Sequence, residues 1–142
     1  MAQAKTETFP RRDPDGRITA LPDLLGVALA GLVIGLLALI VLDWAMALIG
    51  LGEFGRANGW LTVILPAWIF VEEFRAWAGT GPARIAAALV GLAVGIAAGL
   101  LVAGVAVNLE PLWSGALAGS VFALSYALIW FLGIRWLARR TG

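Results

Sequence analysis

The chain contains no cysteine and no histidine among its 142 residues. The missing thiols exclude disulfides, thiolate nucleophiles and cysteine-ligated zinc, and the missing imidazoles exclude histidine-ligated haem and histidine acid–base catalysis. Charged residues are also scarce, at 13%, whereas an average soluble domain carries about 25%. Because so few catalytic groups remain, we expect a protein that is not an enzyme and that holds no metal or cofactor.

Hydrophobic residues make up 61% of the chain and gather in long runs. The run from Leu24 to Leu42 contains no charged residue, and about 20 apolar residues suffice for a helix that crosses a bilayer. Three further runs follow, separated by short segments of glycine, proline and polar residues. We therefore predict an all-α integral membrane bundle of four transmembrane helices with short loops. The predicted spans are residues 23–49, 59–77, 84–107 and 111–136.

The first twenty residues differ in composition from the rest of the chain. They combine charged residues with Pro10, Pro14 and Gly16, and a segment this short and polar cannot bury a core of its own. We expect a flexible cytoplasmic arm at residues 1–20 and a single transmembrane domain at residues 21–142.

The second run, Trp60 to Trp77, is the one whose crossing needs a test. It contains Glu72 and Glu73, and its apolar part would be only about 18 Å long as a helix, against a hydrocarbon core of roughly 30 Å. Arginine and lysine collect on the cytoplasmic side of membrane proteins. Four crossings with the N-terminus inside place nine basic residues in the cytoplasm and only Arg56 outside, whereas three crossings place four inside and six outside. The asymmetry favours four crossings with both termini in the cytoplasm.

The strongest polar feature of the sequence is the pair Glu72 and Glu73, followed by Arg75. A carboxylate near the membrane boundary could bind a proton or a cation. The group could instead mark the cytoplasmic end of the second helix, where Glu72 and Arg75 lie one turn apart. Adjacent residues project about 100° apart on a helix, so we expect one glutamate to face protein and the other to face water. We favour a structural or partner-contact role over a catalytic pair.

Trp68, Glu72, Glu73 and Arg75 together resemble a cluster near a helix end in the small four-span subunits of tripartite periplasmic-binding-protein-dependent transporters. The spacing departs from the pattern of that family, and a Gly-Thr-Gly-Pro break at residues 79–82 follows where those proteins tend to continue. The cluster covers less than a tenth of the chain. The resemblance implies the role of an accessory subunit.

Small residues recur at four-residue intervals in the last two runs. The third run holds Ala87, Gly91, Gly95, Gly99 and Ala103, and the fourth holds Gly115, Gly119, Ala123 and Ala127. Such stripes let two helix backbones approach closely within a membrane. We expect the two stripes to face each other within one chain, with docking of a partner or of a second copy as the alternative. Gly31 and Gly35 of the first run form a shorter stripe of the same kind.

Two single residues leave alternatives open. Asp43 follows the first uncharged run, and it could pair with Arg56, cap the outer end of its helix or take part in transport. Pro66 lies inside the second run, where we expect a static kink; the alternative is a hinge that opens backbone carbonyls to an ion.

These features lead to one preferred function and one alternative. We expect a non-catalytic accessory subunit of a larger membrane complex, either a transporter or an energy-transducing assembly, in a bacterial cytoplasmic membrane. It would contact the lipid bilayer, other integral membrane subunits and possible further copies of itself, and no nucleic acid. The contact residues would be Trp68, Glu72, Glu73, Arg75 and Asp43. The alternative is a small homo-oligomeric transporter or channel for protons or cations that uses Glu72 and Glu73.

Overall fold

The computed structural model describes residues 9–141, and its regular secondary structure is helical. The elements in chain order are α1 (Leu21–Leu48), η1 (Gly59–Val63), α2 (Ile64–Ala76), η2 (Ala78–Thr80), α3 (Pro82–Val105) and α4 (Pro111–Thr141), of which η1 and η2 are short 3-10 helices. The prediction of an all-α protein is confirmed. Three helices, α1, α3 and α4, are long and apolar enough to cross a membrane.

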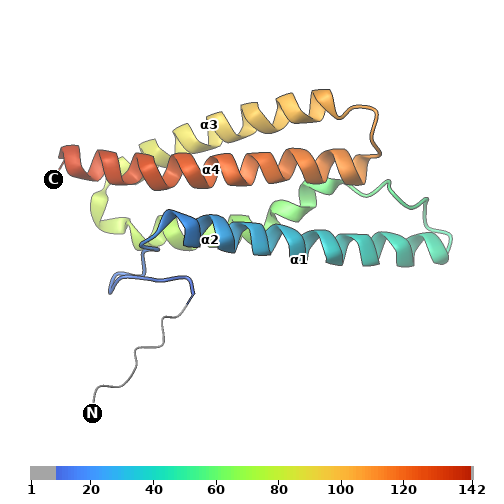
Figure 1. The fold of residues 1–142 in the computed structure, drawn as a ribbon, viewed down its shortest axis with the longest axis horizontal. Coiled ribbons are helices and arrows are strands. Elements are labelled where there is room, and N and C mark those ends of the chain that lie inside the picture. The colour runs from blue at the N-terminus through green and yellow to red at the C-terminus, as the bar shows by residue number, and fades with distance from the viewer. Residues whose placement is uncertain (1–8, 142) are drawn as a thin grey trace, which may run out of the picture.

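The helices form an elongated bundle in which α4 is the central element (Figure 1). One side of α4 packs along α3, and its other side contacts α1 and η1. The start of α1, the end of α2, the start of α3 and the end of α4 lie together at one end of the bundle (Figure 1). We call this the terminal end, and we call the opposite end, which holds the α1–η1 and α3–α4 connections, the loop end.

Local sequence explains where the long helices begin and end. Pro22 and Asp23 occupy the first turn of α1, where proline needs no amide donor and a carboxylate favours the positive end of the helix dipole. Gly81 has a φ of 62° just before Pro82 begins α3, a left-handed conformation that glycine adopts without strain. Arg139 and Arg140 lie in the last turn of α4, where positive charge complements the carbonyl end.

The second run is not one continuous α-helix, and the prediction of a single helix over residues 59–77 is corrected. Its first turn is the 3-10 helix η1, and α-helical structure begins only at Ile64. Pro66 has no N–H to donate to the preceding turn, so it lies in the first turn of α2, where that donor is not required. At rises of roughly 2.0 and 1.5 Å per residue, η1 is about 10 Å long and α2 is about 20 Å long.

The glycines of the two small-residue stripes do not face each other. This corrects the expectation that the stripes of the third and fourth runs meet within the chain. A Cβ on Gly91 would lie 3.0 Å from the Tyr126 ring, and one on Gly95 would lie 3.0 Å from the Phe122 carbonyl oxygen. The stripe of α3 therefore packs against larger residues of α4. Gly115 of α4 instead meets η1, where a Cβ would lie 2.7 Å from the amide nitrogen of Gly59.

The geometry of α4 explains this division. At about 100° per residue, positions three apart are offset by about 60° around a helix, so the Gly115–Gly119 edge and the face that receives α3 are neighbouring strips. A Cβ on Gly99 of α3 would lie 3.0 Å from the carbonyl oxygen of Ala118, and one on Gly119 would lie 2.9 Å from Val63 of η1. The glycines thus create two close approaches to α4, one for each neighbour.

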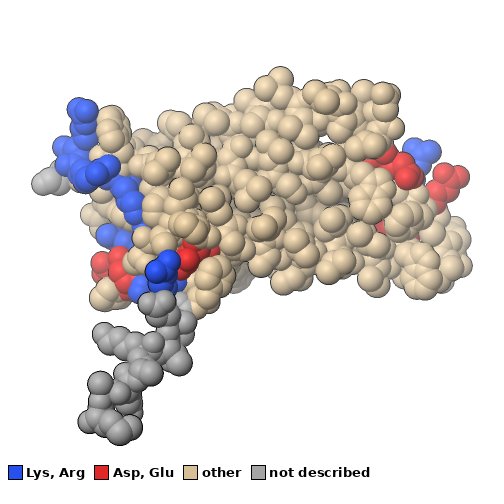
Figure 2. Space-filling view, in the orientation of Figure 1, with Lys and Arg blue, Asp and Glu red and all other residues tan. Residues whose placement is uncertain are grey.

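The surface is divided by polarity along the length of the bundle. Figure 2 shows charged side chains at both ends of the visible face and an uncharged region between them. Large apolar side chains such as Val33, Leu37 and Leu101 are exposed in the long helices. An apolar belt bounded by charged ends is the pattern expected of a bundle surrounded by lipid tails. The arrangement supports membrane association.

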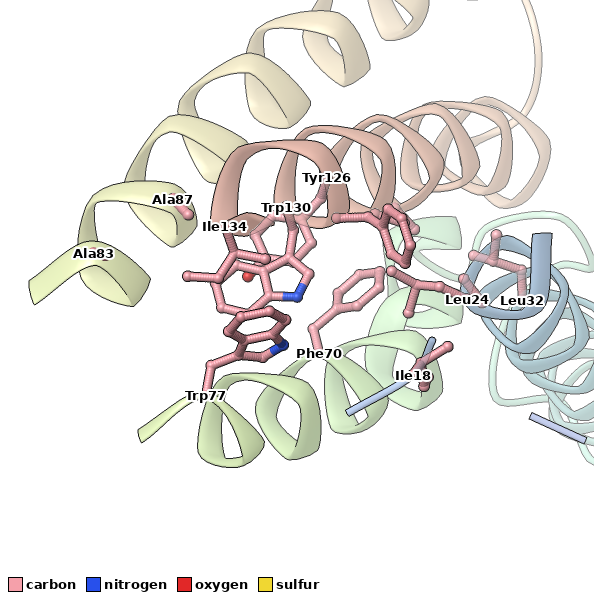
Figure 3. Close-up of a cluster of buried hydrophobic side chains, with 14 residues drawn as sticks. Ile18, Leu24, Leu32, Phe70, Trp77, Ala83, Ala87, Tyr126, Trp130 and Ile134 are labelled. Carbon is pink, nitrogen blue, oxygen red and sulfur yellow. The ribbon is translucent and has the colours of Figure 1, made fainter. Parts of the chain in front are cut away.

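Buried side chains concentrate toward the terminal end. Figure 3 shows Phe70 of α2 and Trp77, which directly follows α2, packed against Tyr126, Trp130 and Ile134 of α4. The rings of Phe70 and Tyr126 are 4.5 Å apart between centroids, and those of Tyr126 and Trp130 are stacked at 6.4 Å. This aromatic cluster encloses the polar group described next.

Candidate functional site

Glu73 is the one acidic side chain of the described residues that is fully buried, with 0% of its surface exposed. It projects from the inner side of α2. Its Oε1 accepts a hydrogen bond from the backbone N–H of Ile18 at 2.6 Å, and its Oε2 accepts one from the indole N–H of Trp130 at 3.2 Å. Both carboxylate oxygens are therefore engaged, and they join three segments that are far apart in the sequence.

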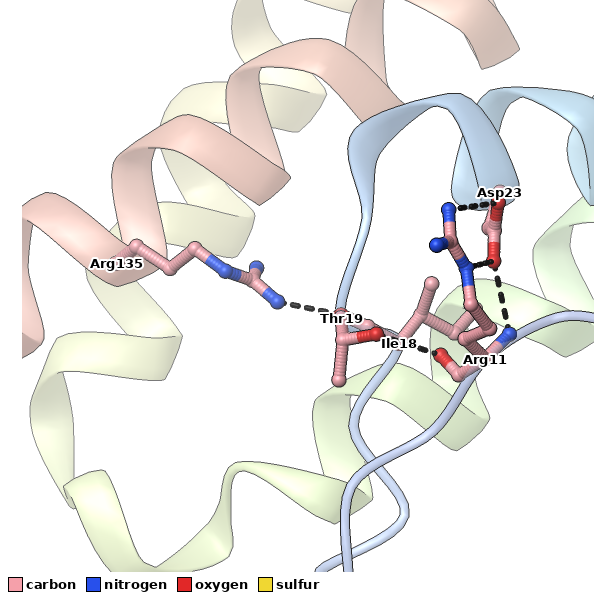
Figure 4. Close-up of polar contacts among 5 residues, drawn as sticks. All are labelled: Arg11, Ile18, Thr19, Asp23 and Arg135. Carbon is pink, nitrogen blue, oxygen red and sulfur yellow. Dashed lines mark hydrogen bonds and ion pairs between the residues drawn. The ribbon is translucent and has the colours of Figure 1, made fainter. Parts of the chain in front are cut away.

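Arg135 of α4 completes the network from the other side of Ile18. Its guanidinium donates a hydrogen bond to the carbonyl of Ile18, whose N–H binds Glu73 (Figure 4). The same guanidinium lies 3.5 Å from the centroid of the Phe131 ring. A single peptide segment thus receives a positive charge on its carbonyl side and a negative charge on its amide side, an arrangement that strengthens both hydrogen bonds.

The segment that carries Ile18 is a compact turn formed by residues 11–19. Arg12 and Ile18 form an antiparallel bridge, and Asp13 accepts hydrogen bonds from the backbone N–H groups of Asp15 and Arg17. The start of the turn is held by Arg11, whose side chain lies 3.0 Å from Asp23 of α1 (Figure 4).

This turn was expected to belong to a flexible arm, yet it lies against the bundle. The reason is that Ile18, at 0% exposure, supplies an apolar anchor while its backbone satisfies Glu73 and Arg135. Residues 1–8 of the expected arm lie outside the described residues.

Trp77, at the end of α2, is flanked by two cations. The guanidinium carbon of Arg17 lies 4.0 Å from the centroid of its ring, and that of Arg135 lies 5.1 Å away. Arg17 also donates to the carbonyl of Ala76 at 3.1 Å. Such cation–π contacts contribute roughly 0.5–2 kcal/mol each. Here Arg17 attaches the turn to the end of α2, and Arg135 attaches α4 to the same ring.

The other polar residues of α2 lie on its outward side. Glu72 is only half-buried and lies 3.7 Å from Arg75, one turn away. Trp68 is exposed over 69% of its surface. The expectation that Glu72 and Glu73 face different surroundings therefore agrees with the structure, and the buried member is Glu73.

Asp43 lies at the loop end of the bundle, far along α1 from the Glu73 network. It is buried, and its Oδ2 accepts a hydrogen bond from the backbone N–H of Gly55 at 2.7 Å. Gly55 in turn accepts from the N–H of Leu112 at 3.0 Å. Arg56 pairs with Glu53 at 3.8 Å. Of the roles expected for Asp43, its position in the structure is closest to capping, because it holds the α1–η1 loop against the end of α1.

The cavities of the described residues are lined mainly by apolar side chains. A cavity of about 250 Å³ between α2, α3 and α4 is bordered by Phe70, Phe74, Phe122 and Tyr126, among others. Another of about 470 Å³ lies between α1 and α4. Within residues 9–141, no three acidic side chains are grouped closely enough to hold a metal ion.

Sequence reasoning missed the partners of Glu73. Ile18 lies 55 positions away in the sequence and Trp130 lies 57 positions away, and no local pattern links them. One signal was available, because a tryptophan deep in an apolar run usually finds an acceptor for its indole N–H. Glu72 and Glu73 were both candidates for that acceptor, and the sequence did not choose between them.

Comparisons of the chain with protein-family models, with curated proteins and with solved structures give no match. The likeness of Trp68, Glu72, Glu73 and Arg75 to the small transporter subunits therefore gains no support from a relative.

Proposed function

We propose that this protein is a non-catalytic subunit of a larger membrane complex, such as a transporter or an energy-transducing assembly, in a bacterial cytoplasmic membrane. In this proposal the chain crosses the membrane four times, with both of its ends in the cytoplasm. The observation that carries the proposal is the division of α2 into two sides. One side holds the bundle together, and the other presents polar and aromatic groups that the chain itself leaves exposed.

The buried carboxylates already accept hydrogen bonds from their own chain. The carboxylate of Glu73 is enclosed and accepts hydrogen bonds from two donors of its own chain. The buried carboxylate of Asp43 likewise binds the backbone of its own loop. Removing either acceptor would leave a buried donor unpaired, so both acidic residues have a structural role that requires no substrate.

The outer face of α2 has a different character. It is a strip at helical spacing that starts at Leu61 of η1 and continues along α2 through Ile64, Leu65, Trp68, Val71, Glu72 and Arg75. Of these seven aligned side chains, two are charged and one is a large exposed indole. Charged groups are unfavourable against lipid tails, so lipid tails alone make a poor environment for this surface. Aromatic residues and arginine are also enriched in protein–protein interfaces. We therefore assign this face to contact with another membrane subunit.

The distribution of charge supports the proposed topology. Hydrogen bonds and ion pairs place Arg11, Arg17, Arg84 and Arg135 at the terminal end, whereas Arg56 lies in the α1–η1 loop at the opposite end. Cytoplasmic segments of membrane proteins carry the excess of arginine and lysine. The terminal end is accordingly assigned to the cytoplasm.

The absence of cysteine allows a direct test of this topology. Single cysteines in place of exposed Glu53 and exposed Gly79 would be the unique thiols of their variants. Four crossings place the two positions on opposite sides of the membrane, so an impermeant maleimide added to intact cells should label Glu53→Cys and spare Gly79→Cys. Labelling of inside-out vesicles should reverse the result. If both variants react from the same side, the second run does not cross and the topology is wrong.

The partner contact is tested by substitutions on the outer face of α2. The affinity-tagged protein, extracted from its native membrane in a mild detergent, is expected to bring down another integral membrane chain in fixed proportion. Replacing Trp68 by alanine should weaken the association about thirtyfold or more and lower the recovered partner accordingly, because buried tryptophans at interfaces typically contribute about 2 kcal/mol or more. Quantitative mass spectrometry of the eluted proteins measures the ratio.

Trp44 supplies the matched control for this experiment. It is an exposed tryptophan of α1, at 57% exposure, and lies outside the face formed by α2. Trp44→Ala should leave partner recovery unchanged. Equal recovery with both variants would refute the assignment of the outer face, and purification of the parent as a lone monomer would refute the proposed function itself.

The alternative is a small proton or cation transporter that uses the paired glutamates. The buried carboxylate of Glu73 is the observation that favours it, since an acidic group inside a membrane protein often serves transport. Against it, Glu73 and Asp43 lie at opposite ends of the bundle, and Glu72 lies outside it. Ion flux through the purified protein in liposomes that disappears in Glu73→Gln would favour this alternative over the subunit role.

A further inference from the structure

A groove at the terminal end combines arginine side chains with apolar walls. It has a volume of about 440 Å³ and is lined by Trp77, Leu132, Arg135, Ala138 and Arg139. We propose that this groove binds an anionic phospholipid, with the lipid phosphate on the two arginines and the upper part of an acyl chain against the apolar residues. The inference rests on the proposed placement of this end in the cytoplasm, and it requires no partner subunit.

The two arginines leave hydrogen-bond donors available for a ligand. Arg139 is exposed, and its side chain makes no hydrogen bond or ion pair with residues 9–141. Arg135 donates one hydrogen bond to Phe131 at 3.3 Å and one to Ile18, and a guanidinium has five N–H groups. The remaining N–H groups of Arg135 belong to a side chain already held in place, so binding a phosphate there costs little side-chain ordering.

The charges around the groove favour an anionic over a zwitterionic headgroup. Arg17 lies on the ring of Trp77 and adds a third guanidinium beside Arg135. The acidic groups that influence Arg135 are Glu73 and Asp13, and both already accept hydrogen bonds from the backbone of residues 15–18. A choline or ethanolamine cation would approach these guanidinium groups unfavourably, whereas a glycerol headgroup adds no positive charge.

The apolar walls identify the source of the phosphate as a lipid. Leu132 is exposed over 53% of its surface and lies one helical turn from Arg135 toward the uncharged belt. Trp77 lies at the end of α2, at the depth where tryptophan rings favour the boundary between lipid tails and headgroups. Figure 2 shows Lys and Arg side chains at the terminal end, with acidic side chains among them, adjoining the uncharged belt. A free phosphate would use the arginines and leave these walls uncovered.

The proposal is tested by lipid titration of the purified, delipidated protein in a neutral detergent. Phosphatidylglycerol added to the micelles should raise the Tm in a saturable manner, because a ligand that binds only the folded state stabilises it. Phosphatidylcholine and inorganic phosphate at the same concentrations should have little effect. Arg139→Gln should weaken the apparent affinity for phosphatidylglycerol about fivefold, since one basic residue near an anionic lipid contributes about 1 kcal/mol.

Arg140 provides the matched control, since it is the neighbouring arginine but lies over the ring of Trp136, at 4.7 Å, and does not line the groove. Arg140→Gln should retain the parent affinity, and equal losses in the two variants would show only a diffuse charge effect and overturn the site. A response to inorganic phosphate as large as that to phosphatidylglycerol would overturn the lipid assignment. If Arg139→Gln has a lower Tm than the parent even without lipid, Arg139→Lys replaces the parent as the reference. Equal affinities of Arg139→Gln and Arg139→Lys for phosphatidylglycerol would then refute the proposal. None of these results depends on whether a partner subunit binds to α2.

Discussion

Replacing Gly59 by alanine is expected to lower the free energy of unfolding by about 3 kcal/mol or more, because the added methyl group has no room. Gly59 begins η1 and is buried against the first turns of α4. A Cβ at this position would overlap the carbonyl oxygen of Leu112 and the amide nitrogen of Ala116, both of which belong to a helix backbone that cannot move aside. The Tm of the protein in detergent micelles measures the effect.

Gly104 of α3 is the matched control for this substitution. It lies within a helix, as do Leu112 and Ala116, which Gly59 contacts. A Cβ added at Gly104 would meet no atom within 4 Å. Gly104→Ala should leave the Tm unchanged or slightly raise it, since alanine favours helix by up to about 1 kcal/mol over glycine. If both variants had the same Tm as the parent, the close approach of η1 to α4 would be wrong.

The second large effect is expected at Glu73. Glu73→Ala removes the acceptor for the N–H of Ile18 and for the indole of Trp130, and each unpaired buried donor costs about 1–3 kcal/mol. We expect the free energy of unfolding to fall by about 3 kcal/mol. Glu73→Gln retains one acceptor oxygen and places an amide NH₂ against the other donor, so it should cause a smaller loss than Glu73→Ala. Thermal unfolding in detergent, followed by tryptophan fluorescence, measures both variants.

Glu72 serves as the control for Glu73 because it is the same residue type, one position earlier on the same helix. Its carboxylate is partly exposed and lies 3.7 Å from exposed Arg75, and surface ion pairs contribute at most about 1 kcal/mol. Glu72→Ala should therefore change stability little. A loss for Glu72→Ala as large as that for Glu73→Ala would mean that the Glu73 network does not hold the terminal end together.

The role of Glu73 also changes how the acidic pair should be interpreted. A buried carboxylate in a membrane helix suggests transport when it is considered by itself. Here its two oxygens bind the Ile18 turn and α4, and Arg135 binds the other side of the same peptide segment. The network holds the helices together at the terminal end of the bundle. The groups left for external contact are those on the outer face of α2 and those of the groove that contains Arg135 and Arg139.

Much of the architecture followed from patterns that are local in the sequence. The uncharged run from Leu24 to Leu42 and the later apolar runs predicted the long helices, because a helix that meets lipid tails must be apolar over its whole length. Gly81 and Pro82 predicted the break before α3. The 100° step between Glu72 and Glu73 was sufficient to predict that the two carboxylates would face different surroundings.

Which partner each face receives was decided only by the tertiary structure. The repeats of glycine predicted close packing at Gly91, Gly95, Gly99, Gly115 and Gly119, but a repeat carries no information about its partner. The fold placed Gly91, Gly95 and Gly99 of α3 against α4, with the Trp60 ring of η1 also beside Gly99. It placed the first glycines of α4 against η1. In the same way, the polar arm near Ile18 lost its expected freedom once Glu73 and Arg135 were brought to it across more than 50 positions of sequence. Helix formation depends on neighbours in the chain, whereas burial of a carboxylate depends on donors that only the packing of distant segments supplies.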